Sequence, residues 1–257
     1  MEITQKEQSV LLDCMLDMGE LLLDAGAEVS RVEDTLSRMG RAYGASRMDV
    51  FVITSIISMS MEFPDTQAVT ETRRIRSNGQ TDFRRLEWLN ELSRQCCADP
   101  LPVSQLRERI QRIASGHKPL SVILGGSVLG AGSFAVFFGG TIWDGLAAAV
   151  FALAVCFLQN RLGRTQVNTA AFNLVISLLI GLGVGLAVIL LPTLHMDKIL
   201  IGDIMLLIPG LAMTNAIRNM LVGDTISGVV RLAESLIWAG ALAGGFMIAL
   251  LIVNVLM

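Results

Sequence analysis

The chain has 257 residues, 53% of them hydrophobic, and carries a formal net charge of −3 at pH 7. That hydrophobic share excludes an ordinary soluble domain of this length, and the negative balance argues against a nucleic-acid-binding protein. Most charged residues lie in residues 1–118, while apolar runs dominate residues 119–257. We therefore predict an α-helical integral membrane protein, in which a small cytoplasmic α+β domain (1–118) precedes a membrane domain (119–257) with about five transmembrane helices.

Cysteine and histidine give no sign of a metal or disulfide site. The four cysteines contain no CxxC pair, and only two histidines accompany them. A zinc site needs about four such ligands at characteristic spacing, so no metal and no cofactor is predicted. The first residues, MEITQKEQ, lack the basic stretch and apolar run of a signal peptide, so we expect the first domain to stay in the cytoplasm.

Periodicity predicts four helices and two strands in the first domain. Apolar residues recur at helical spacing through Leu11, Met15 and Leu22, and again in three later segments. The stretch after Gly44 is rich in Val, Ile, Ser and Thr, which favours strands. The predicted helices cover about 4–25, 28–43, 83–97 and 103–115, and the predicted strands cover 48–61 and 67–76, with turns at 63–65 and 78–79.

Catalysis is not expected in this domain. Ser55, Ser58 and Ser60 are candidate nucleophiles by residue type only, since no GxSxG elbow and no histidine base accompany them. Neither a P-loop nor a GxGxxG motif is present in the sequence. The protein is therefore predicted not to be an enzyme.

Arginines gather near the end of the second predicted strand, at Arg73-Arg74-Ile75-Arg76 and Arg84-Arg85. Such a run can bind an anionic ligand or a lipid surface. It can also protect a solvated strand edge by charge, and the second interpretation is favoured.

Five apolar segments in the membrane domain are long enough, or nearly so, to span a bilayer. They cover about 119–139, 143–159, 169–191, 199–217 and 235–256. Lysine and arginine lie mostly on one side of these segments, at Arg109, Arg112, Lys118, Arg161, Arg164, Arg218 and Arg231, against Lys198 on the other side. By the positive-inside rule the N-terminus is cytoplasmic and the C-terminus is outside.

The fourth segment is interrupted in its middle by Pro209-Gly210. Proline cannot donate to the carbonyl of Met205, and an unsatisfied carbonyl in lipid costs several kcal/mol. A broken helix of this kind is a sequence sign of a transport site, although it is also compatible with a packed proline kink. Thr214, Asn215 and Arg218 follow the break and are candidate substrate-binding residues.

Glycines at a spacing of four suggest close helix packing. The pairs are Gly126/Gly130, Gly181/Gly185 and Gly240/Gly244, and they suit either a bundle within this chain or the seam of a homo-oligomer. Five spans show no internal repeat, so either a second copy or a second, different membrane subunit would complete a pathway.

Two stretches of this sequence resemble the threonine/serine exporter family. They are GELLLDAGAEVSRVEDTLSRMGRAYG (Gly19 to Gly44) and IPGLAMTNAIRNMLVGDTISGVVRLAES (Ile208 to Ser235), and the similarity extends in the same order over essentially the whole chain. The resemblance implies a bacterial inner-membrane exporter. It also implies a split type, in which a longer subunit of this kind pairs with a short helical partner, and one such pair is associated with succinate export.

The resemblance also implies functional positions in the two stretches. These are Gly26, Glu28, Arg31 and Glu33 in the first, and Pro209, Gly210, Asn215, Arg218, Gly223, Asp224, Gly228 and Arg231 in the second. Asn219 departs from the family pattern, in which an aspartate is expected, so no acidic role is expected there.

We therefore predict a subunit of a secondary exporter for small polar metabolites, either threonine/serine-type amino acids or a dicarboxylate such as succinate. The predicted substrate-binding residues are Pro209, Gly210, Thr214, Asn215, Arg218, Asp224 and Arg231. Arg218 would hold a carboxylate, and Asp203 or Glu234 would serve proton coupling unless both are simply interfacial. The alternative is a membrane-anchored ligand sensor without transport of its own.

Overall fold

A computed structural model describes residues 5–64, 66–75, 81–116, 119–162 and 168–256. The turn expected at Asn78-Gly79 and the basic residues Arg76, Lys118 and Arg164 lie outside these ranges. The described chain is mostly helical, with one three-stranded sheet near the N-terminus. It divides into two compact units: Met1–His117 together with Leu211–Leu232, and Lys118–Gly210 together with Ala233–Met257.

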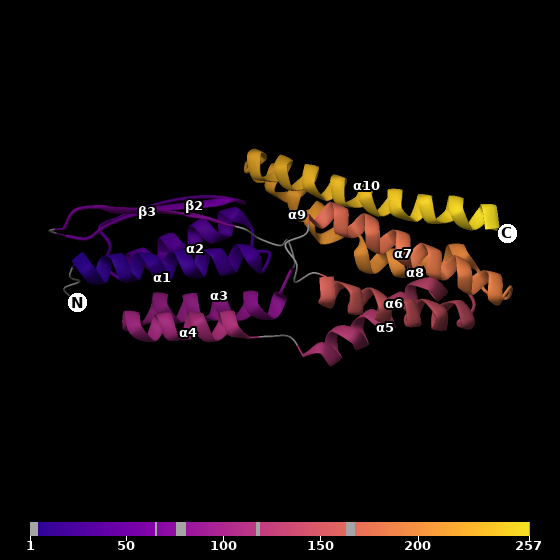
Figure 1. The fold of residues 1–257 in the computed structure, drawn as a ribbon. Helices are drawn as coiled ribbons and strands as arrows, with labels where there is room; N and C mark the ends of the chain where they lie inside the picture. The colour runs from indigo at the N-terminus through magenta and orange to yellow at the C-terminus, as the bar shows by residue number, and fades with distance from the viewer. Residues whose placement is uncertain (1–4, 65, 76–80, 117–118, 163–167, 257) are drawn as a thin grey trace. The chain divides into compact units, whose positions relative to one another are not determined.

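The N-terminal part of the first unit has three layers (Figure 1). Its elements are α1 (Gln5–Asp24), α2 (Val29–Ala42), β1 (Arg47–Ile53), β2 (Ile56–Glu62), β3 (Val69–Arg74), α3 (Phe83–Ala98) and α4 (Val103–Ser115). Helices α1 and α2 lie between the sheet on one side and α3 and α4 on the other. The apolar stripe predicted for α1 is fully buried there, because both of its neighbouring layers cover it.

The single strand predicted for residues 48–61 is wrong, because two antiparallel strands, β1 and β2, occupy this stretch. The chain turns at Thr54-Ser55, and Ile53 pairs with Ile56. The buried positions are even-numbered in β1, at Met48 and Val52, and odd-numbered in β2, at Ile57, Met59 and Met61. This switch from even to odd buried positions indicates a hairpin. The turn residues themselves do not, because Thr-Ser lacks the Gly or Asn that usually marks a two-residue turn.

The candidate serines of β2 pair with threonines of β3 on the exposed face of the sheet. Ser58 Oγ and Thr72 Oγ1 lie 2.9 Å apart, and Thr70 Oγ1 donates to Ser60 Oγ at 2.9 Å. These cross-strand bonds hold the register of the β2–β3 pair. Their hydroxyls therefore have a structural role in the sheet.

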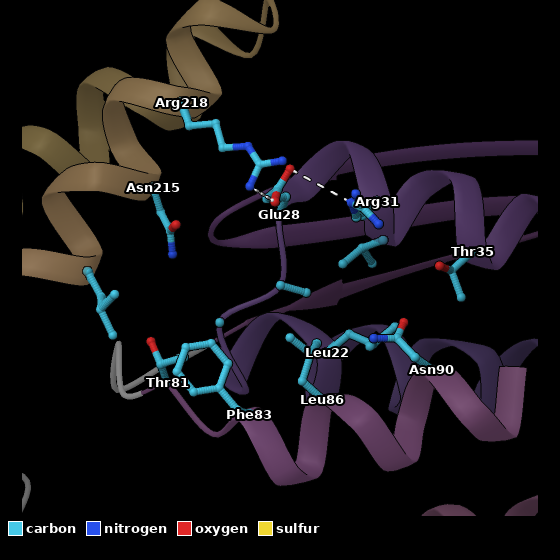
Figure 2. Close-up of a pocket in the computed structure, with 14 residues that line it drawn as sticks. Leu22, Glu28, Arg31, Thr35, Thr81, Phe83, Leu86, Asn90, Asn215 and Arg218 are labelled. Carbon is cyan, nitrogen blue, oxygen red and sulfur yellow. Dashed lines mark ion pairs between the residues drawn. The ribbon is translucent and has the colours of Figure 1, made fainter.

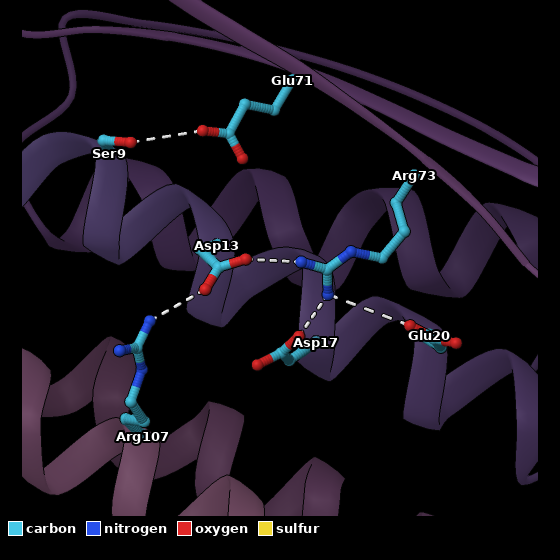
Figure 3. A network of polar contacts seen from close by, with 7 residues as sticks. All are labelled: Ser9, Asp13, Asp17, Glu20, Glu71, Arg73 and Arg107. Atoms are coloured by element: carbon cyan, nitrogen blue, oxygen red, sulfur yellow. Dashed lines mark hydrogen bonds and ion pairs between the residues drawn. The ribbon is translucent and has the colours of Figure 1, made fainter.

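Arginines of the basic run are held by carboxylates of α1 (Figure 3). Arg73 forms ion pairs with Asp13 and Asp17, and Arg107 of α4 approaches the other oxygen of Asp13 at 2.8 Å. In the same way Arg85 lies 3.3 Å from Asp24. Arg73 and Arg85 therefore stabilise the unit through ion pairs, while Arg74 and Arg84 are exposed.

The second unit is a bundle of apolar helices. It contains α5 (Leu120–Phe137), α6 (Ile142–Leu162), α7 (Thr169–Leu190), α8 (Met196–Leu207) and the greater part of α10 (Thr225–Leu256). Four of its helices are long and apolar enough to cross a membrane, and the bent pair of α8 and α9 (Gly210–Leu221) gives a fifth candidate. The predicted count of about five spans agrees with this result.

The glycine pairs differ in what they contact. A Cβ at Gly181 would lie 2.5 Å from the Cβ of Ala249, so α7 and α10 approach closely at this pair. In contrast, Gly126, Gly240 and Gly244 have no described atom within 4 Å of the Cβ position. Among the three pairs, Gly181/Gly185 therefore serves close packing within the described part of this chain, whereas Gly130 has an ordinary contact with Leu206 at 3.5 Å.

Candidate functional site

The fourth apolar segment is broken where the sequence predicts it. Helix α8 ends at Leu207, and the Ile208 N–H donates to the Ile204 carbonyl at 2.9 Å. Pro209 has no N–H to offer Met205, and the Gly210 N–H turns to the Ile208 carbonyl at 2.9 Å. The axes of α8 and α9 consequently differ by 51°.

Two glycines of the second motif form the hairpin that follows α9. Gly223 has φ +100°, a left-handed conformation that favours glycine. A Cβ at Gly228 would lie 2.8 Å from the Ala216 carbonyl oxygen and 3.0 Å from the Met220 nitrogen. Both glycines therefore have a backbone role, since they let α10 fold back closely against α9.

Within the first unit, α9 borders a pocket of about 300 Å³ (Figure 2). The pocket is also lined by the end of α1, the start of α2 and the start of α3, including Thr81, Phe83 and Asn90. Gly26 has φ +90° and allows the tight turn from α1 into α2 that places Glu28 at the rim. The two motifs that carry the family resemblance, with 163 residues of chain between Gly44 and Ile208, thus meet at one pocket.

The polar centre of the pocket is a carboxylate between two guanidinium groups. Arg218 Nη1 lies 2.6 Å from Glu28 Oε1, and Arg31 Nε lies 4.0 Å from Glu28 Oε2. The Glu28 side chain is 16% exposed and that of Arg218 is 52% exposed. Arg218 is therefore the partner that a ligand can reach from solvent, whereas the mostly buried Glu28 carboxylate depends on the guanidinium groups beside it.

Asn215 lies one turn of α9 before Arg218 and lines the same pocket (Figure 2). Its amide offers both a donor and an acceptor. Together Glu28, Arg31, Asn215 and Arg218 can bind one carboxylate, one ammonium group and one hydroxyl, which are the groups of a small polar amino acid.

A second meeting of the two motifs involves Glu33 and Asp224. Glu33 Oε1 accepts a hydrogen bond from the Val52 N–H at 2.8 Å, which ties α2 to β1. Burial, together with the charge of Asp224, raises the pKa of Glu33 above its ordinary value. Asp224 Oδ2 is itself buried and has no hydrogen-bond partner among the described residues.

The structure brings two of the seven predicted site residues together in the pocket, namely Asn215 and Arg218. Pro209 and Gly210 form the break, and Thr214 is exposed on α9. Asp224 lies in the turn before α10 and Arg231 on the second turn of that helix, and neither lines the pocket. Thr81, Phe83 and Asn90 were missed, and no local pattern marks them.

Comparison with known proteins gives relatives along nearly the whole chain. A "Probable threonine/serine exporter" of Mycobacterium tuberculosis is 24% identical over 93% of this chain, which spans 46% of that protein's length. A "Probable succinate transporter subunit YjjP" of Escherichia coli is 23% identical over 97% of this chain and 96% of its own length. The YjjP of Klebsiella aerogenes is 25% identical over 91% of this chain and 90% of its own length. No solved structure matches the chain.

A family model covers almost the complete sequence. Its description reads "Putative threonine/serine exporter", and it matches residues 13–253. The matched range contains both motifs, the broken segment and every apolar helix. The chain belongs to the threonine/serine exporter family.

Proposed function

We propose that this chain is a subunit of a secondary exporter that moves small polar metabolites out of the bacterial cytoplasm. The observation that carries the proposal is the broken segment, whose second half places Asn215 and Arg218 in a pocket with Glu28 and Arg31. A volume of about 300 Å³ lies at the lower end of ligand sites, as a substrate of amino-acid size requires. Membership of an exporter family supports transport rather than catalysis.

The charges of the pocket favour an amino acid over a dicarboxylate. In this proposal Arg218 and Arg31 bind the substrate carboxylate, Glu28 binds its ammonium group, and Asn215 binds its hydroxyl. Succinate, the substrate in the name of the YjjP relatives, has two carboxylates and no cation, so Glu28 would repel it. Threonine and serine, in the name of the M. tuberculosis relative, satisfy all of these groups.

The membrane placement belongs to the same proposal. Helices α5, α6, α7 and α10 and the bent pair α8–α9 would form five spans in the inner membrane. The asymmetry of lysine and arginine favours a cytoplasmic N-terminal domain and an external C-terminus. Arg218 would then meet the substrate from the cytoplasmic side.

A second membrane subunit is proposed as the partner, alone or together with a second copy of this chain. Support comes from the word "subunit" in the name of the YjjP relatives and from the greater length of the M. tuberculosis relative. The open glycines on α5 and α10 are available for such a contact.

Export by the native host tests the proposed site, because that host supplies any partner. Labelled threonine, serine and succinate are followed in cells carrying Arg218→Lys, Glu28→Gln or Asn215→Ala, and rates are divided by protein abundance. Loss of one substrate hydrogen bond of about 1.4 kcal/mol should lower amino-acid export roughly tenfold. Glu28→Gln should not lower succinate export, since it removes the repulsive charge.

Arg38→Lys is the matched control, because Arg38 lies farther along α2 in an exposed ion pair with Asp34. It should export like the parent. Parental export by all three pocket variants at normal abundance would contradict the proposed site.

A ligand sensor is the second candidate, and the composition of the pocket favours it. Most of the lining residues belong to the N-terminal domain, and only Leu211, Asn215 and Arg218 come from α9. A sensor would bind threonine at the same residues with no flux. Two results together would select this function. The parent chain would bind threonine but export nothing, and Arg218→Lys would abolish that binding.

A further inference from the structure

Asp203 is a carboxylate in the apolar face of α8. The buried residues of this helix are Ile199, Leu200, Gly202, Asp203 and Leu207, which recur at helical spacing and face the bundle. Asp203 is 0% exposed, and both of its carboxylate oxygens are buried without a hydrogen-bond partner among the described residues. It therefore occupies a position where the pattern calls for an apolar side chain.

Close packing at this level leaves little room for water. A Cβ at the adjacent Gly202 would lie 2.5 Å from the Ala131 carbonyl oxygen and 3.1 Å from the Ala135 Cβ. Helix α8 thus runs directly against α5 beside Asp203.

Asp144 of α6 is a second buried carboxylate in this bundle, and unlike Asp203 it is surrounded by hydrogen-bond donors. It too is 0% exposed, but its oxygens accept bonds from the Thr141 N–H and hydroxyl at 2.7 and 2.8 Å and from the His195 N–H at 2.7 Å. Those donors replace water around the charge. In the described part of the chain, Asp203 has no such donors.

Among the described residues of α5, α6 and α7, which pack against α8, Arg161 is the one cation, and it is distant from Asp203. It lies 13 residues beyond Ala148, the α6 residue beside Gly202, which is about 20 Å along the helix at 1.5 Å per residue. Helices α5 and α7 contain no ionisable residue, and α6 contains Asp144, Cys156 and Arg161. On α8 itself, Asp197 and Lys198 pair with each other in the first turn, just after His195. Lys198 is five residues from Asp203, about 7.5 Å along the helix at 1.5 Å per residue.

An isolated ionised carboxylate in such surroundings is far too costly, and the neutral acid is the form that can be buried. We propose that the Asp203 carboxyl is a proton-binding site, which holds a proton while α8 is packed as in this structure and releases it to water when α8 moves. The acid then becomes a carboxylate and water becomes hydronium, with no other reactant.

The break supplies a means for that movement. Asp203 lies four residues before Leu207, where α8 ends, so it is about one turn from the 51° bend. A change of the bend would repack the last turn of α8 and admit water to Asp203. Resting on the proposed function, this site would couple proton movement to export.

Infrared spectroscopy of the purified full chain tests proton binding without any transport. At neutral pH the parent should show the C=O stretch of a protonated carboxylic acid, and Asp203→Asn should lose it. Asp197→Asn is the matched control, because Asp197 is on the same helix and 66% exposed, and it should retain the band. Selective ¹³C labelling of aspartate carboxyl carbons should shift the band in the unaltered chain, which tests the assignment without a substitution.

Absence of the band from the parent, or its persistence in Asp203→Asn, would overturn the proton site. Export from cells treated with nigericin, which collapses the pH gradient, tests the coupling: the parent and Asp197→Asn should slow, whereas Asp203→Asn should be slow already and insensitive. A nigericin response of Asp203→Asn equal to that of the parent would overturn the coupling. If the parent exports none of the three metabolites while the band behaves as expected, the proposed function fails and the proton site stands.

Discussion

The carboxylate of Glu33 carries an electrostatic cost in the folded chain. It is half-buried, it accepts one backbone hydrogen bond from Val52, and it lies in the field of Asp224. Both burial and that field disfavour its ionised form, which is why its pKa is raised. The folded chain consequently binds a proton at Glu33 more tightly than the unfolded chain does.

Glu33→Gln should raise the thermal unfolding temperature of the detergent-solubilised chain at neutral pH. Gln keeps an oxygen for the Val52 N–H and removes the charge. Since the folded pKa lies above the ordinary value of 4.5, the destabilisation by Glu33 is absent below about pH 4.5 and grows as pH rises through the folded pKa.

The gain from Glu33→Gln should therefore vanish on acidification. A gain that is equal at acidic and neutral pH would show that charge is not its cause.

At the scale of residues, the sequence alone was sufficient to single out Asn215 and Arg218, as polar side chains that follow a break in an apolar segment, and both line the pocket. Their role in binding a substrate stays a prediction. The ion pair of Arg218 with Glu28 was not predictable. It depends on how α9 packs beside α2, and no local spacing encodes a contact between residues so far apart in sequence.

At the scale of helices, the break at Pro209 sets the direction of α9. Pro209→Ala should restore the missing donor and favour one continuous helix, since proline in a helix interior costs about 3 kcal/mol relative to alanine. Export per unit of protein should fall, because Asn215 and Arg218 would be turned away from their present directions. The measurement is labelled-threonine export in the native host.

Pro100→Ala, in the connection between α3 and α4, provides the control for proline loss and should leave export unchanged. Normal export by Pro209→Ala at normal abundance would show that the break is a packing kink with no role in transport.

Gly202→Ala should destabilise the bundle by about 1–3 kcal/mol, as overpacking does. Its Cβ would meet the backbone carbonyl of Ala131, which cannot move aside as a side chain can. Gly130→Ala is the matched substitution, because its Cβ would lie 3.5 Å from Leu206 Cδ2, an ordinary contact. Thermal unfolding in detergent should separate the two variants, and equal effects would contradict the packing argument.

The helices of the N-terminal domain were predictable from apolar periodicity because each buries one apolar stripe, and the spans were predictable from the length of their apolar runs. The hairpin of β1 and β2 was missed because its two strands together resemble one apolar run, and only the parity of the buried positions separates them. The break of the fourth span at Pro209 was also predictable from the sequence. The angle of the bend was not, because it depends on how the helices pack.

For the molecule as a whole, the proposed orientation can be tested with two introduced cysteines. Thr193→Cys, in the connection between α7 and α8, should react with an impermeant thiol reagent added outside intact cells, and Val222→Cys, after α9, should not. The parent should stay unlabelled, since Cys97 is its exposed cysteine among the described residues and belongs to the N-terminal unit. The opposite pattern would reverse the topology.

Reconstituted alone in proteoliposomes, the chain should move no threonine, serine or succinate above background. Export of any of these should reappear when membrane proteins from the native host are reconstituted with it. Full activity of the lone chain would remove the need for a second subunit.

Composition divides the chain near residue 118, because charge falls sharply there. Composition could not predict that residues 211–232 pack with the first unit. That packing depends on the Arg218–Glu28 pair and on the closeness of α9 and α10 at Gly228, and both are properties of the assembled chain.

The central position of α1 has a consequence for biosynthesis. Its apolar face is covered by α4, and Asp13 pairs with Arg107, 94 residues later in the chain. At a translation rate of about 5–20 residues per second, several seconds pass between the synthesis of α1 and that of α4. During this time the apolar face of α1 that α4 later covers is exposed. Helix α4 ends at Ser115 and the first apolar helix begins at Leu120, so closure of the N-terminal domain and entry of the first span into the insertion machinery fall at nearly the same moment of synthesis.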